Sequence, residues 1–443
     1  MANRLFGTDG VRGLANAELT CELAFRLGEA AVAFAGRDVC LGRDTRKSGV
    51  MLESAMAAGI MSAGGTPHCA GVIPTPAVAL LTRELGCDGG IVTSASHNPP
   101  EYNGIKFFSD RGMKLPDDVE GQIEDFVRGG GPDPAGRPTG DGVGTVDKVK
   151  DARDRYVAHA LSTIDCDLSG LRVAVDCAHG ASCRTTPAAL RALGADLTVI
   201  NTDYDGVDIN VGCGSTHLGP LKRLVAETGA DVGLAHDGDA DRVLFVDENG
   251  DEVDGDFVLA ICGTDLARQG RLPRNEIVST VMCNLGLTTA MRAAGIDVVQ
   301  TRVGDRYVLE RMVADGAAIG GEQSGHIIFL EHNSTGDGLV TALQVLATMR
   351  RSGKRLSELK SVMERFPQAL VNVRCPRKAE LEGSAAVAGA VAAAEAELAD
   401  TGRVLVRASG TEPLVRVMVE ARSDEAARRC AGAIADVVRR ELG

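Results

Sequence analysis

The segment "DVCLGRDTR" (Asp38–Arg46) begins the pattern that decides the fold. It is followed by "ESAMAAGIMSAGGTPHCAGV" (Glu53–Val72) and then by "ALLTRELGCDGGIVTSASHN" (Ala79–Asn98). The order is an apolar strand, a helix that ends at glycine, a second strand, another such helix and a third strand. Apolar residues recur at i, i+3 and i+4 in both helices, and glycine is the usual residue after a helix end. The segment therefore predicts a βαβαβ unit.

The same order returns twice further along the chain. The second copy spans Leu171–Asp241 and starts with "LRVAVDCAHG", and the third spans Glu276–His326 and starts with "EIVSTVMCNLG". The strands are continuous runs of β-branched residues, which is typical of sheets covered on both faces. A unit used three times predicts three similar domains.

The last part of the chain has a different pattern. An Ala/Glu-rich helix, "AAVAGAVAAAEAELA", precedes two strands, "RVLVRASG" and "LVRVMVEA", and a terminal helix, "DEAARRCAGAIADVVRREL". We therefore predict an α/β protein with three similar mixed α/β domains at residues 1–149, 150–251 and 252–365, and a C-terminal α+β domain at 366–443. A chain of 443 residues is too long for one ordinary core.

Composition limits the functions that the chain can have. The net charge of −14, with no long basic run, argues against a nucleic-acid partner. The 12 cysteines form no C-x-x-C pair, which argues against a clustered zinc site and favours a reducing compartment. The N-terminus "MANRLFGTDG" has no apolar signal segment, and no long apolar run follows. These features predict a cytoplasmic protein with no membrane partner.

Each of the three repeats ends in a polar loop. The loops are "TSASHNPP" (93–100), "HDGDADR" (236–242) and "GEQSGH" (321–326). In open parallel sheets, ligands bind at the carboxyl ends of the strands. Three matched positions with unlike polar groups therefore indicate one functional site built from three loops.

The second loop is a candidate metal site. Asp237, Asp239 and Asp241 alternate, so on an extended segment all three carboxylates would face one side. Such a cluster is unfavourable without a cation, and carboxylate oxygens suit Mg²⁺. An EF-hand is excluded because Arg242 stands where that loop needs glycine. Arg242 is expected to bind phosphate or to pair with a carboxylate; the alternative is a solvated acidic turn.

The stretch "RASGTEPLVR" (407–416) is a candidate anion cradle. It combines two guanidiniums, two hydroxyls and a glycine, supplied by Arg407, Ser409, Gly410, Thr411 and Arg416. The alternative is a β-turn with surface arginines.

The third loop is a candidate sugar site. Glu322 and Ser324 are two residues apart and would share one side of an extended chain. A carboxylate and a hydroxyl suit sugar hydroxyls or an amino group. A structural turn explains the motif as well, and a structural role is the more frequent one for a residue such as His326.

Cationic residues in two further stretches could line a phosphate site in this acidic chain, or could be ordinary solvated charges. They are Arg12 in "FGTDGVRG" and Arg43, Arg46 and Lys47 in "GRDTRKSG".

Ser96 is the candidate nucleophile of the first loop. The G-x-S-x-G motif of serine hydrolases is absent, so a hydrolase triad has little support. A serine that exchanges phosphate needs a metal, positive groups and a proton carrier. The aspartates could supply the first need, and Lys106 or His326 the third. Ser94 is expected to be only a neighbour, and His97 has no firm role.

Four motifs together resemble the α-D-phosphohexomutase superfamily. They are "TSASHNPPEYNGIKFF", "HDGDADR", "GEQSGH" and "RASGTEPLVRV", and they span all four predicted domains. "FGTDGVRG" and "CGSTH" are similar to the bacterial branch that acts on glucosamine phosphates. The phosphomannomutase/phosphoglucomutase branch typically has Met in place of Gln323 and Asn in place of Gly410. The family also usually has Phe and Gly where this chain has His236 and Ala240.

The resemblance implies a heart-shaped protein with a central cleft, in which Ser96 carries a phosphoryl group. One Mg²⁺ per chain would be bound by the Ser96 phosphate with Asp237, Asp239 and Asp241. Glu322 and Ser324 would contact the sugar, and the 407–416 cradle would hold its non-reacting phosphate. Lys106, His326 and Arg12 would serve proton transfer or phosphate contact.

The implied activity is that of an isomerase that interconverts glucosamine 6-phosphate and glucosamine 1-phosphate through a 1,6-bisphosphate. The resemblance also implies activation by glucosamine or glucose 1,6-bisphosphate, supply of UDP-N-acetylglucosamine for cell-wall synthesis, and a homodimer. The alternatives are a phosphomannomutase/phosphoglucomutase, a metal-dependent sugar phosphatase and a non-catalytic sugar-phosphate sensor.

Overall fold

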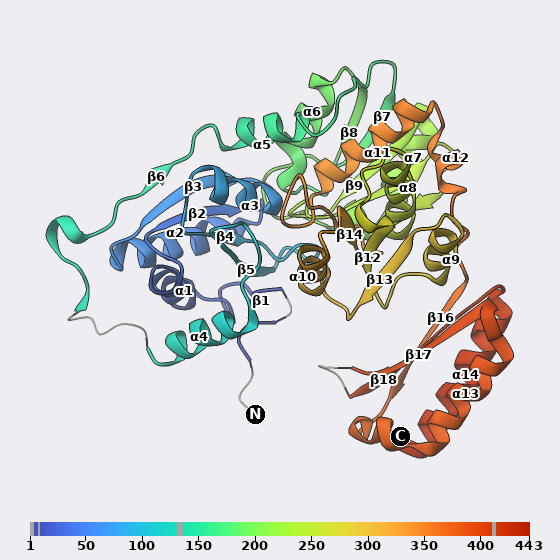
Figure 1. Ribbon diagram of the computed structural model, residues 1–443. Coiled ribbons are helices and arrows are strands. Elements are labelled where there is room, and N and C mark those ends of the chain that lie inside the picture. The colour runs from blue at the N-terminus through green and yellow to red at the C-terminus, as the bar shows by residue number, and fades with distance from the viewer. Residues whose placement is uncertain (1–3, 8, 131–135, 410–412) are drawn as a thin grey trace. The chain divides into compact units, whose positions relative to one another are not determined.

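The computed structural model describes residues 4–7, 9–130, 136–409 and 413–443 (Figure 1). Its contacts divide the chain into two compact units. The first unit comprises residues 1–282 and 296–362, and the second comprises residues 283–295 and 363–443. Three mixed sheets lie in the first unit and an antiparallel sheet lies in the second.

The first sheet contains the first predicted βαβαβ unit. Its strands, in spatial order, are β1 (Val11–Leu14), β5 (Tyr102–Ser109), β4 (Gly89–Thr93), β2 (Asp38–Arg43), β3 (Thr66–Val72) and β6 (Asp147–Lys148). Strands β2, β3 and β4 are parallel, and α2 (Lys47–Ser62) and α3 (Thr75–Glu84) connect them in the predicted order.

Helices cover both faces of this sheet (Figure 1). Val39 and Leu41 of β2 share a core with α1 (Cys21–Phe34), α2 and α4 (Asp117–Arg128). The alternate residue Gly42 faces α3, where an added Cβ would lie 2.5 Å from a methyl carbon of Val78. The small residue therefore lets α3 approach the sheet closely.

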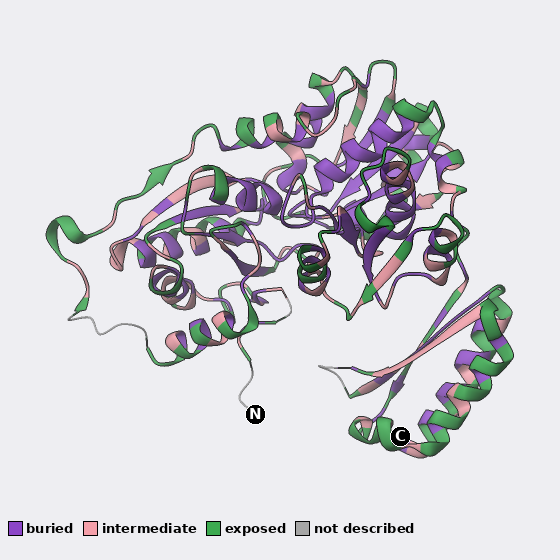
Figure 2. Cartoon of the chain, viewed as in Figure 1, coloured by how far each residue is buried: buried purple, intermediate pink, exposed green. Residues whose placement is uncertain are grey.

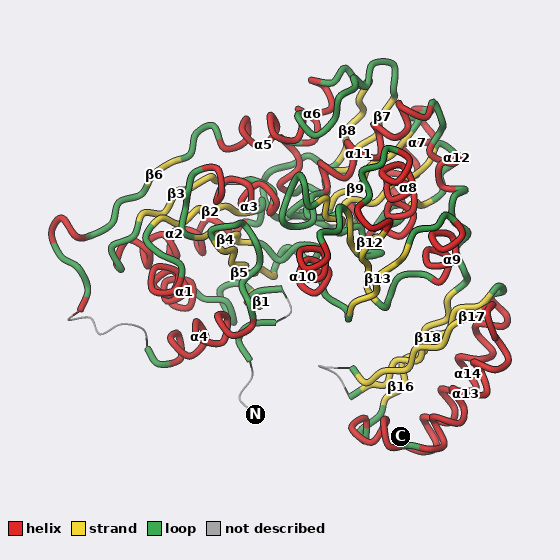
Figure 3. Tube along the Cα trace, in the orientation of Figure 1, coloured by secondary structure: helices red, strands yellow, loops and turns green. Residues whose placement is uncertain are grey.

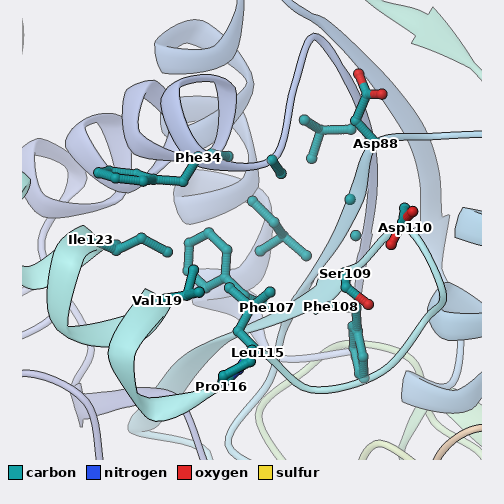
Figure 4. A pocket seen from close by; sticks show the side chains of 16 residues that line it. Phe34, Asp88, Phe107, Phe108, Ser109, Asp110, Leu115, Pro116, Val119 and Ile123 are labelled. Carbon is teal, nitrogen blue, oxygen red and sulfur yellow. The ribbon is translucent and has the colours of Figure 1, made fainter.

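A mainly apolar pocket of about 310 Å³ lies on the α1 and α4 side of the sheet (Figure 4). Phe34, Phe107, Val119 and Ile123 line it. No residue of the three polar loops lines this pocket, so it is separate from the candidate site.

The second and third sheets repeat the pattern. The second has the order β11 (Glu252–Val253), β10 (Val243–Asp247), β9 (Val232–His236), β7 (Arg172–Asp176) and β8 (Asp196–Ile200). The third has the order β13 (Asp297–Thr301), β12 (Glu276–Thr280), β14 (Ile319–Gly321) and β15 (Ile327–Phe329). The repeat helices are α6 (Thr186–Ala192), α7 (Gly219–Thr228), α9 (Leu285–Ala293) and α10 (Asp305–Asp315). The remaining helices of the first unit are α5 (Ala152–Leu161), α8 (Gly255–Arg268), α11 (Gly338–Ser352) and α12 (Leu356–Lys360).

Glycine ends all six helices of the repeats, as predicted. Each is followed within two residues by a glycine with positive φ, a conformation that costs glycine little. These glycines are Gly64, Gly86, Gly194, Gly229, Gly295 and Gly316.

The third strand of each repeat continues into an antiparallel partner. Strand β4 pairs with β5, β9 with β10, and β14 with β15. The three predicted polar loops are the connections of these hairpins. The hairpin of β4 and β5 can be followed in Figure 3. The loops thus lie at the carboxyl ends of buried parallel strands, as expected (Figure 2).

The second unit holds the predicted α+β fold. Its antiparallel sheet has the order β16 (Gln368–Arg374), β18 (Leu414–Ala421) and β17 (Gly402–Ala408), and α13 (Ala385–Leu398) and α14 (Asp424–Leu442) share its core. The sequence pattern did not assign β16. Helix α9 belongs to this unit, although its sequence position is in the third repeat.

The predicted fold class, with three mixed α/β parts and a C-terminal α+β part, is confirmed. Among the described residues, no helix is both long and apolar enough to span a bilayer. The heart-shaped outline with its central cleft remains a prediction.

Candidate functional site

Ser96 occupies a constrained position just beyond β4. Its φ is +50°, in the left-handed region that non-glycine residues rarely adopt, and its side chain is fully buried. Its Oγ donates a hydrogen bond of 2.6 Å to Oδ2 of Asp237, which lies 141 residues further along the chain. The fold therefore brings the first polar loop against the second.

Ser94 supports this loop rather than competing with Ser96. Its Oγ donates to Oδ2 of Asp44 over 2.6 Å and accepts the Ser96 amide over 2.9 Å. The side chain thus fixes the turn that carries Ser96.

The idea that "GRDTRKSG" lines a phosphate site is wrong for its two arginines. Arg43 pairs with Glu53 at 2.6 Å. Arg46 is buried, and its guanidinium is used by backbone carbonyls and by Asp44. Sequence could not separate these roles, because the two arginines lie only three residues apart at the end of β2.

The three aspartates converge, although their backbone is not extended. Residues 237–242 form a tight turn in which Ala240 has a φ of +55°. One potential ligand atom from each of Asp237, Asp239 and Asp241 lies within 4.8 Å of the others, and all three residues are buried. Oδ1 of Asp239 and Oδ1 of Asp241 have no hydrogen-bond partner among the described residues. Buried carboxylate oxygens that accept no hydrogen bond fit a divalent metal ion, which this cluster can hold.

Lys106 provides the positive charge beside these carboxylates. Its buried Nζ lies 3.0 Å from Oδ2 of Asp239, 3.0 Å from Oδ2 of Asp9 and 3.5 Å from Oδ2 of Asp241. Burial alone would lower the pKa of Lys106, but the three carboxylates outweigh it and raise the pKa. The ammonium form is therefore favoured, and it partly neutralises the cluster.

The aspartates divide the charge unequally. Burial, together with the charges of Asp241 and Asp239, raises the pKa of Asp237 well above its usual value. Burial acts the same way on Asp241, but Lys106, His326 and Arg242 more than compensate and lower its pKa. Of these two carboxylates, Asp237 is therefore the one that a proton favours.

His326 is held between two carboxylates. Nδ1 lies 3.5 Å from Oδ2 of Asp241 and Nε2 lies 3.5 Å from Oδ2 of Asp305. The Gly336 amide donates to Nε2 over 3.0 Å, so a neutral ring carries its hydrogen on Nδ1. Burial opposes protonation, but the carboxylates outweigh it and raise the pKa of His326. The ring can thus hold one proton or two beside the cluster.

His97 belongs to the site, which the sequence did not reveal. Its Nδ1 lies 3.4 Å from Oγ of Ser96 and 3.2 Å from Nη1 of Arg242. Burial, with the charges of Arg242 and Arg12, lowers the pKa of His97 to about 4. The ring is therefore neutral near pH 7. Adjacency to Ser96 was the only signal, and it says nothing about direction.

A cavity of about 450 Å³ opens beside these groups. Arg12, His97, Arg242, Glu322 and His326 line it. Its walls therefore carry the cation of Arg12 from β1, the cation of Arg242 from the second loop and the carboxylate of Glu322 from the third. Arg12 forms an ion pair with Asp9 on this wall, and Arg242 lies 3.8 Å from Asp241.

Asp9, Lys114 and Asp305 form a network that the sequence analysis missed. Nζ of Lys114 lies 2.5 Å from Oδ1 of Asp9 and 2.5 Å from Oδ2 of Asp305. Asp9 was visible beside Arg12 in a motif already singled out. Lys114 and Asp305 belong to no motif, and only the fold brings them together.

The third loop is a turn and not an extended segment. The Glu322 amide donates to the His326 carbonyl over 3.0 Å. Oε1 of Glu322 accepts the Gly304 amide over 3.3 Å, and Glu322 lines the cavity. Ser324 does not line it, and its Oγ is buried with no hydrogen-bond partner among the described residues. The structure thus separates two residues that were expected to act side by side.

The anion cradle lies in the second unit. Arg407 on β17 and Arg416 on β18 are directly paired and half-buried. Ser409 is buried, and its carbonyl accepts a hydrogen bond of 2.6 Å from Lys378. Gly410 and Thr411 lie outside the described residues.

Four family models match the chain. They are the phosphoglucomutase/phosphomannomutase alpha/beta/alpha domains I, II and III and the C-terminal domain, at residues 3–131, 154–250, 254–366 and 370–437. Each match falls almost entirely inside one of the four predicted domains. The domain boundaries themselves remain predictions.

Relatives with known names are similar over nearly the whole chain. The phosphoglucosamine mutase of Clostridium novyi is 52% identical over 446 residues, which are 98% of each chain. That of Moorella thermoacetica is 56% identical over 422 residues, covering 94% of this chain and 95% of the relative.

Solved structures share the fold. A phosphoglucomutase/phosphomannomutase family protein from Burkholderia thailandensis has a TM-score of 0.83 at 25% identity and covers 100% of this chain and 99% of its own. The N-acetylphosphoglucosamine mutase of Aspergillus fumigatus has a TM-score of 0.69 at 18% identity, with 99% and 96% coverage. The chain therefore belongs to the phosphoglucomutase/phosphomannomutase family, among the bacterial phosphoglucosamine mutases.

Proposed function

We propose that this protein interconverts glucosamine 6-phosphate and glucosamine 1-phosphate, with Ser96 as the phosphoryl carrier. The observation that carries the proposal is the 2.6 Å contact between Oγ of Ser96 and Asp237, inside a buried cluster of three aspartates. Relatives named phosphoglucosamine mutase, 52% and 56% identical, support the choice of substrate.

The metal in this proposal is Mg²⁺, held by Asp237, Asp239, Asp241 and the phosphate on Ser96. The Oδ1 atoms of Asp239 and Asp241 accept no hydrogen bond among the described residues, and they support it because hard oxygen ligands suit this ion. When bound, Mg²⁺ would offset the negative charge of the transferring phosphoryl group. The A. fumigatus mutase of the same fold was solved with GlcNAc-6P and magnesium.

The reaction has two symmetrical halves. The bond between phosphorus and Oγ of Ser96 breaks as a sugar hydroxyl bonds to that phosphorus and gives up its proton. This produces glucosamine 1,6-bisphosphate. The other phosphoryl group then returns to Ser96, and the oxygen that it leaves on the sugar takes a proton. Glucosamine or glucose 1,6-bisphosphate would phosphorylate an empty Ser96 and so act as the activator.

The proton carrier is assigned to His326 or Lys106. His326 is supported by its place on the cavity wall and by its ability to hold one proton or two. Lys106 is supported by its three carboxylate partners, although these favour the charged form. Arg12, Arg242 and the neutral His97 would contact phosphate or sugar oxygens across the cavity.

Substrate recognition is assigned to two groups of residues. Glu322, with Ser324 after a local rearrangement of the turn, would contact the sugar. The non-reacting phosphate would be held by the cradle residues Arg407, Ser409, Gly410, Thr411 and Arg416. The product would supply UDP-N-acetylglucosamine for cell-wall synthesis. A cytoplasmic location and a homodimer remain predictions.

The test is phosphorylation of Ser96. Wild-type protein incubated with glucose 1,6-bisphosphate should gain one phosphoryl group by intact mass and should convert glucosamine 6-phosphate. Ser96→Ala should gain none and lose turnover by at least about 1,000-fold. Ser54→Ala is the matched control, because the Ser54 hydroxyl donates a hydrogen bond to the Val50 carbonyl within α2. Turnover by Ser96→Ala without phosphorylation would contradict the proposal and indicate another chemistry. A wild-type protein that neither gains a phosphoryl group nor converts glucosamine 6-phosphate would favour the non-catalytic sensor.

Two assays separate the alternative enzymes. A higher kcat/KM for glucose or mannose 6-phosphate than for glucosamine 6-phosphate would assign the chain to the neutral-hexose branch. Release of free phosphate at the rate of substrate consumption would assign it to a phosphatase.

A further inference from the structure

Arg46 is surrounded by the backbone of the Ser96 loop. Its side chain is fully buried. Nη2 donates to the carbonyls of Ser96 and Asn98 over 3.0 and 2.7 Å. Nη1 donates to the carbonyls of Tyr102, over 3.0 Å, and Pro99. We name these four carbonyls the carbonyl socket. One guanidinium thus binds carbonyls from Ser96 to Tyr102, across the loop that carries Ser96.

The remaining donor of Arg46 completes its hydrogen bonding. Nε donates to Oδ2 of Asp44 over 2.9 Å. The same carboxylate oxygen accepts from Ser94, whose Oγ in turn accepts the Ser96 amide. All five N–H groups of Arg46 therefore have protein acceptors. No donor is left for a phosphate, so Arg46 is not a phosphate ligand.

A second anchor reaches the same socket from the second repeat. Nδ2 of Asn210 donates to the Ser96 carbonyl over 2.8 Å and to the Asn98 carbonyl over 3.1 Å. Asn210 has a φ of +63°, which asparagine tolerates well. Two carbonyls of the loop are thus each held by donors from two different parts of the fold.

The anchors act where the backbone is strained. Ser96 has a φ of +50° without being glycine, and such a conformation persists only when surrounding contacts enforce it. Its Oγ must also stay near Asp237 for phosphoryl transfer. Among the described residues, that Oγ has Asp237 and His97 as its polar neighbours, whereas Arg46 and Asn210 bind the Ser96 carbonyl. Any effect of Arg46 or Asn210 on the Oγ therefore passes through the loop backbone.

We propose that Arg46 and Asn210 are positioning residues for phosphoryl transfer: they hold the carbonyl socket and thereby keep Ser96 strained and aimed at the aspartate cluster. The proposal rests on the proposed function, because it takes Ser96 as the phosphoryl carrier. It gives Arg46, the second arginine of "GRDTRKSG", a role that differs from both phosphate binding and surface charge.

The main variant is Arg46→Lys. It keeps the positive charge, but an ammonium has three N–H donors on a flexible stem and cannot reproduce the five-donor fork. Arg43→Lys is the matched control, because Arg43 leaves the same strand and pairs with Glu53 instead. Asn210→Gly is the second variant, in case Arg46→Lys folds poorly. Glycine suits a φ of +63°, so this variant removes the side-chain amide, with its donor to the socket, without straining the backbone.

Four quantities are measured on the full-length protein with Mg²⁺. They are the rate of Ser96 phosphorylation by glucose 1,6-bisphosphate, kcat and KM for glucosamine 6-phosphate, and the Mg²⁺ Kd by calorimetry. For Arg46→Lys we expect the phosphorylation rate and kcat to fall by about 100-fold, the scale of a small misplacement of reacting groups. KM and the Mg²⁺ Kd should stay near wild type, and Arg43→Lys should change none of the four quantities.

The variant that combines Arg46→Lys with Asn210→Gly tests whether the two residues act on the same loop. Arg46 and Asn210 share two acceptors, so their effects on kcat should be non-additive. Hydrogen exchange of residues 94–104 should also quicken in both single variants. Wild-type phosphorylation in Arg46→Lys, a loss confined to KM, or additive effects would each overturn the proposal.

Failure of the proposed function would look different. Wild-type protein would then take up no phosphoryl group on Ser96 at all. A slowed Arg46→Lys beside a phosphorylated wild type supports both proposals. A phosphorylated wild type beside an equally fast Arg46→Lys overturns only the positioning role.

Discussion

Arg407 and Arg416 occupy directly opposed positions on β17 and β18, so two guanidiniums share one face of an antiparallel pair. Directly opposed like charges destabilise a sheet. Burial and the charge of Arg416 both lower the pKa of Arg407. An arrangement that costs stability is expected where an anion binds, because the anion removes the repulsion.

Arg407→Gln should therefore separate binding from stability. Loss of one charge-assisted hydrogen bond, worth about 1.5–3 kcal/mol, should raise KM for glucosamine 6-phosphate by about tenfold or more. The free energy of unfolding should not fall, because the repulsion is relieved. Steady-state kinetics and urea denaturation check the two effects. Arg428→Gln, on the exposed face of α14, is the control and should leave KM unchanged. An unchanged KM in Arg407→Gln would remove this arginine from the phosphate site.

Metal binding should release a proton. Burial, with the charges of Asp241 and Asp239, raises the pKa of Asp237 in metal-free protein, so at a pH below that raised pKa the bound metal displaces a proton. A carboxylic acid is protonated below its pKa, so Mg²⁺ affinity should fall as pH falls through that raised pKa, by up to tenfold per pH unit for one proton. Calorimetry in two buffers of different ionisation enthalpy measures the proton count.

Asp237→Asn is the variant for the same experiment. It should bind Mg²⁺ more weakly and with less proton release, since the titrating group is gone. Equal proton release in this variant and in wild type would assign the proton to another group.

Gly336→Ala should disturb His326 directly. An added Cβ would lie 2.5 Å from Nδ1 of the His326 ring, so the ring must shift. If His326 transfers the proton, kcat should fall by about 100-fold or more with little change in KM. Overpacking should also cost about 1–3 kcal/mol of stability, so kinetics are measured well below the melting temperature.

Gly432→Ala is the control for this prediction. Gly432 lies in α14 and an added Cβ there meets no atom within 4 Å, so stability should rise by about 0.5–1 kcal/mol with unchanged kinetics. Wild-type kcat in Gly336→Ala would instead point to Lys106 as the proton carrier.

His236 should make the fold sensitive to acid. Burial lowers the pKa of His236 from 6.5 to about 4. Between pH 6.5 and pH 4 this histidine is protonated in the unfolded chain but stays neutral in the folded chain. The free energy of unfolding therefore decreases as pH falls through that window. The loss should reach about 3 kcal/mol at pH 4.

His236→Phe tests this directly, since phenylalanine cannot titrate. With EDTA present, the difference in urea midpoint between wild type and His236→Phe should shift against wild type as pH is lowered. The variant also loses the contacts of His236 with Thr186 and the Arg242 carbonyl, which sets a pH-independent offset. A constant difference from pH 7 to pH 4 would show that His236 does not titrate in this range.

Much of the architecture could be predicted because its signals are local. The helix ends of the repeats are marked by glycines such as Gly229 and Gly316, whose positive φ needs no distant partner. The buried strands are recognisable in the sequence as continuous apolar runs. Local signals do not suffice where the structure depends on residues that are distant in sequence. The sequence does not reveal β16, and it predicts extended chain where the structure has the turn at Ala240.

The sequence by itself determined the order of strands and helices, the three polar loops at the carboxyl ends of strands, and the three closely spaced aspartates. The apolar periodicity and the glycines that end helices are patterns of a few neighbouring residues, so they can be recognised in the sequence. Only the tertiary structure decided that Asn210 holds the Ser96 carbonyl, that Lys114 joins Asp9 to Asp305, and that Arg46 holds the loop rather than a phosphate. These contacts join residues that are 50 to 191 positions apart or compete for the same acceptors, and such choices are made only when the sheets pack.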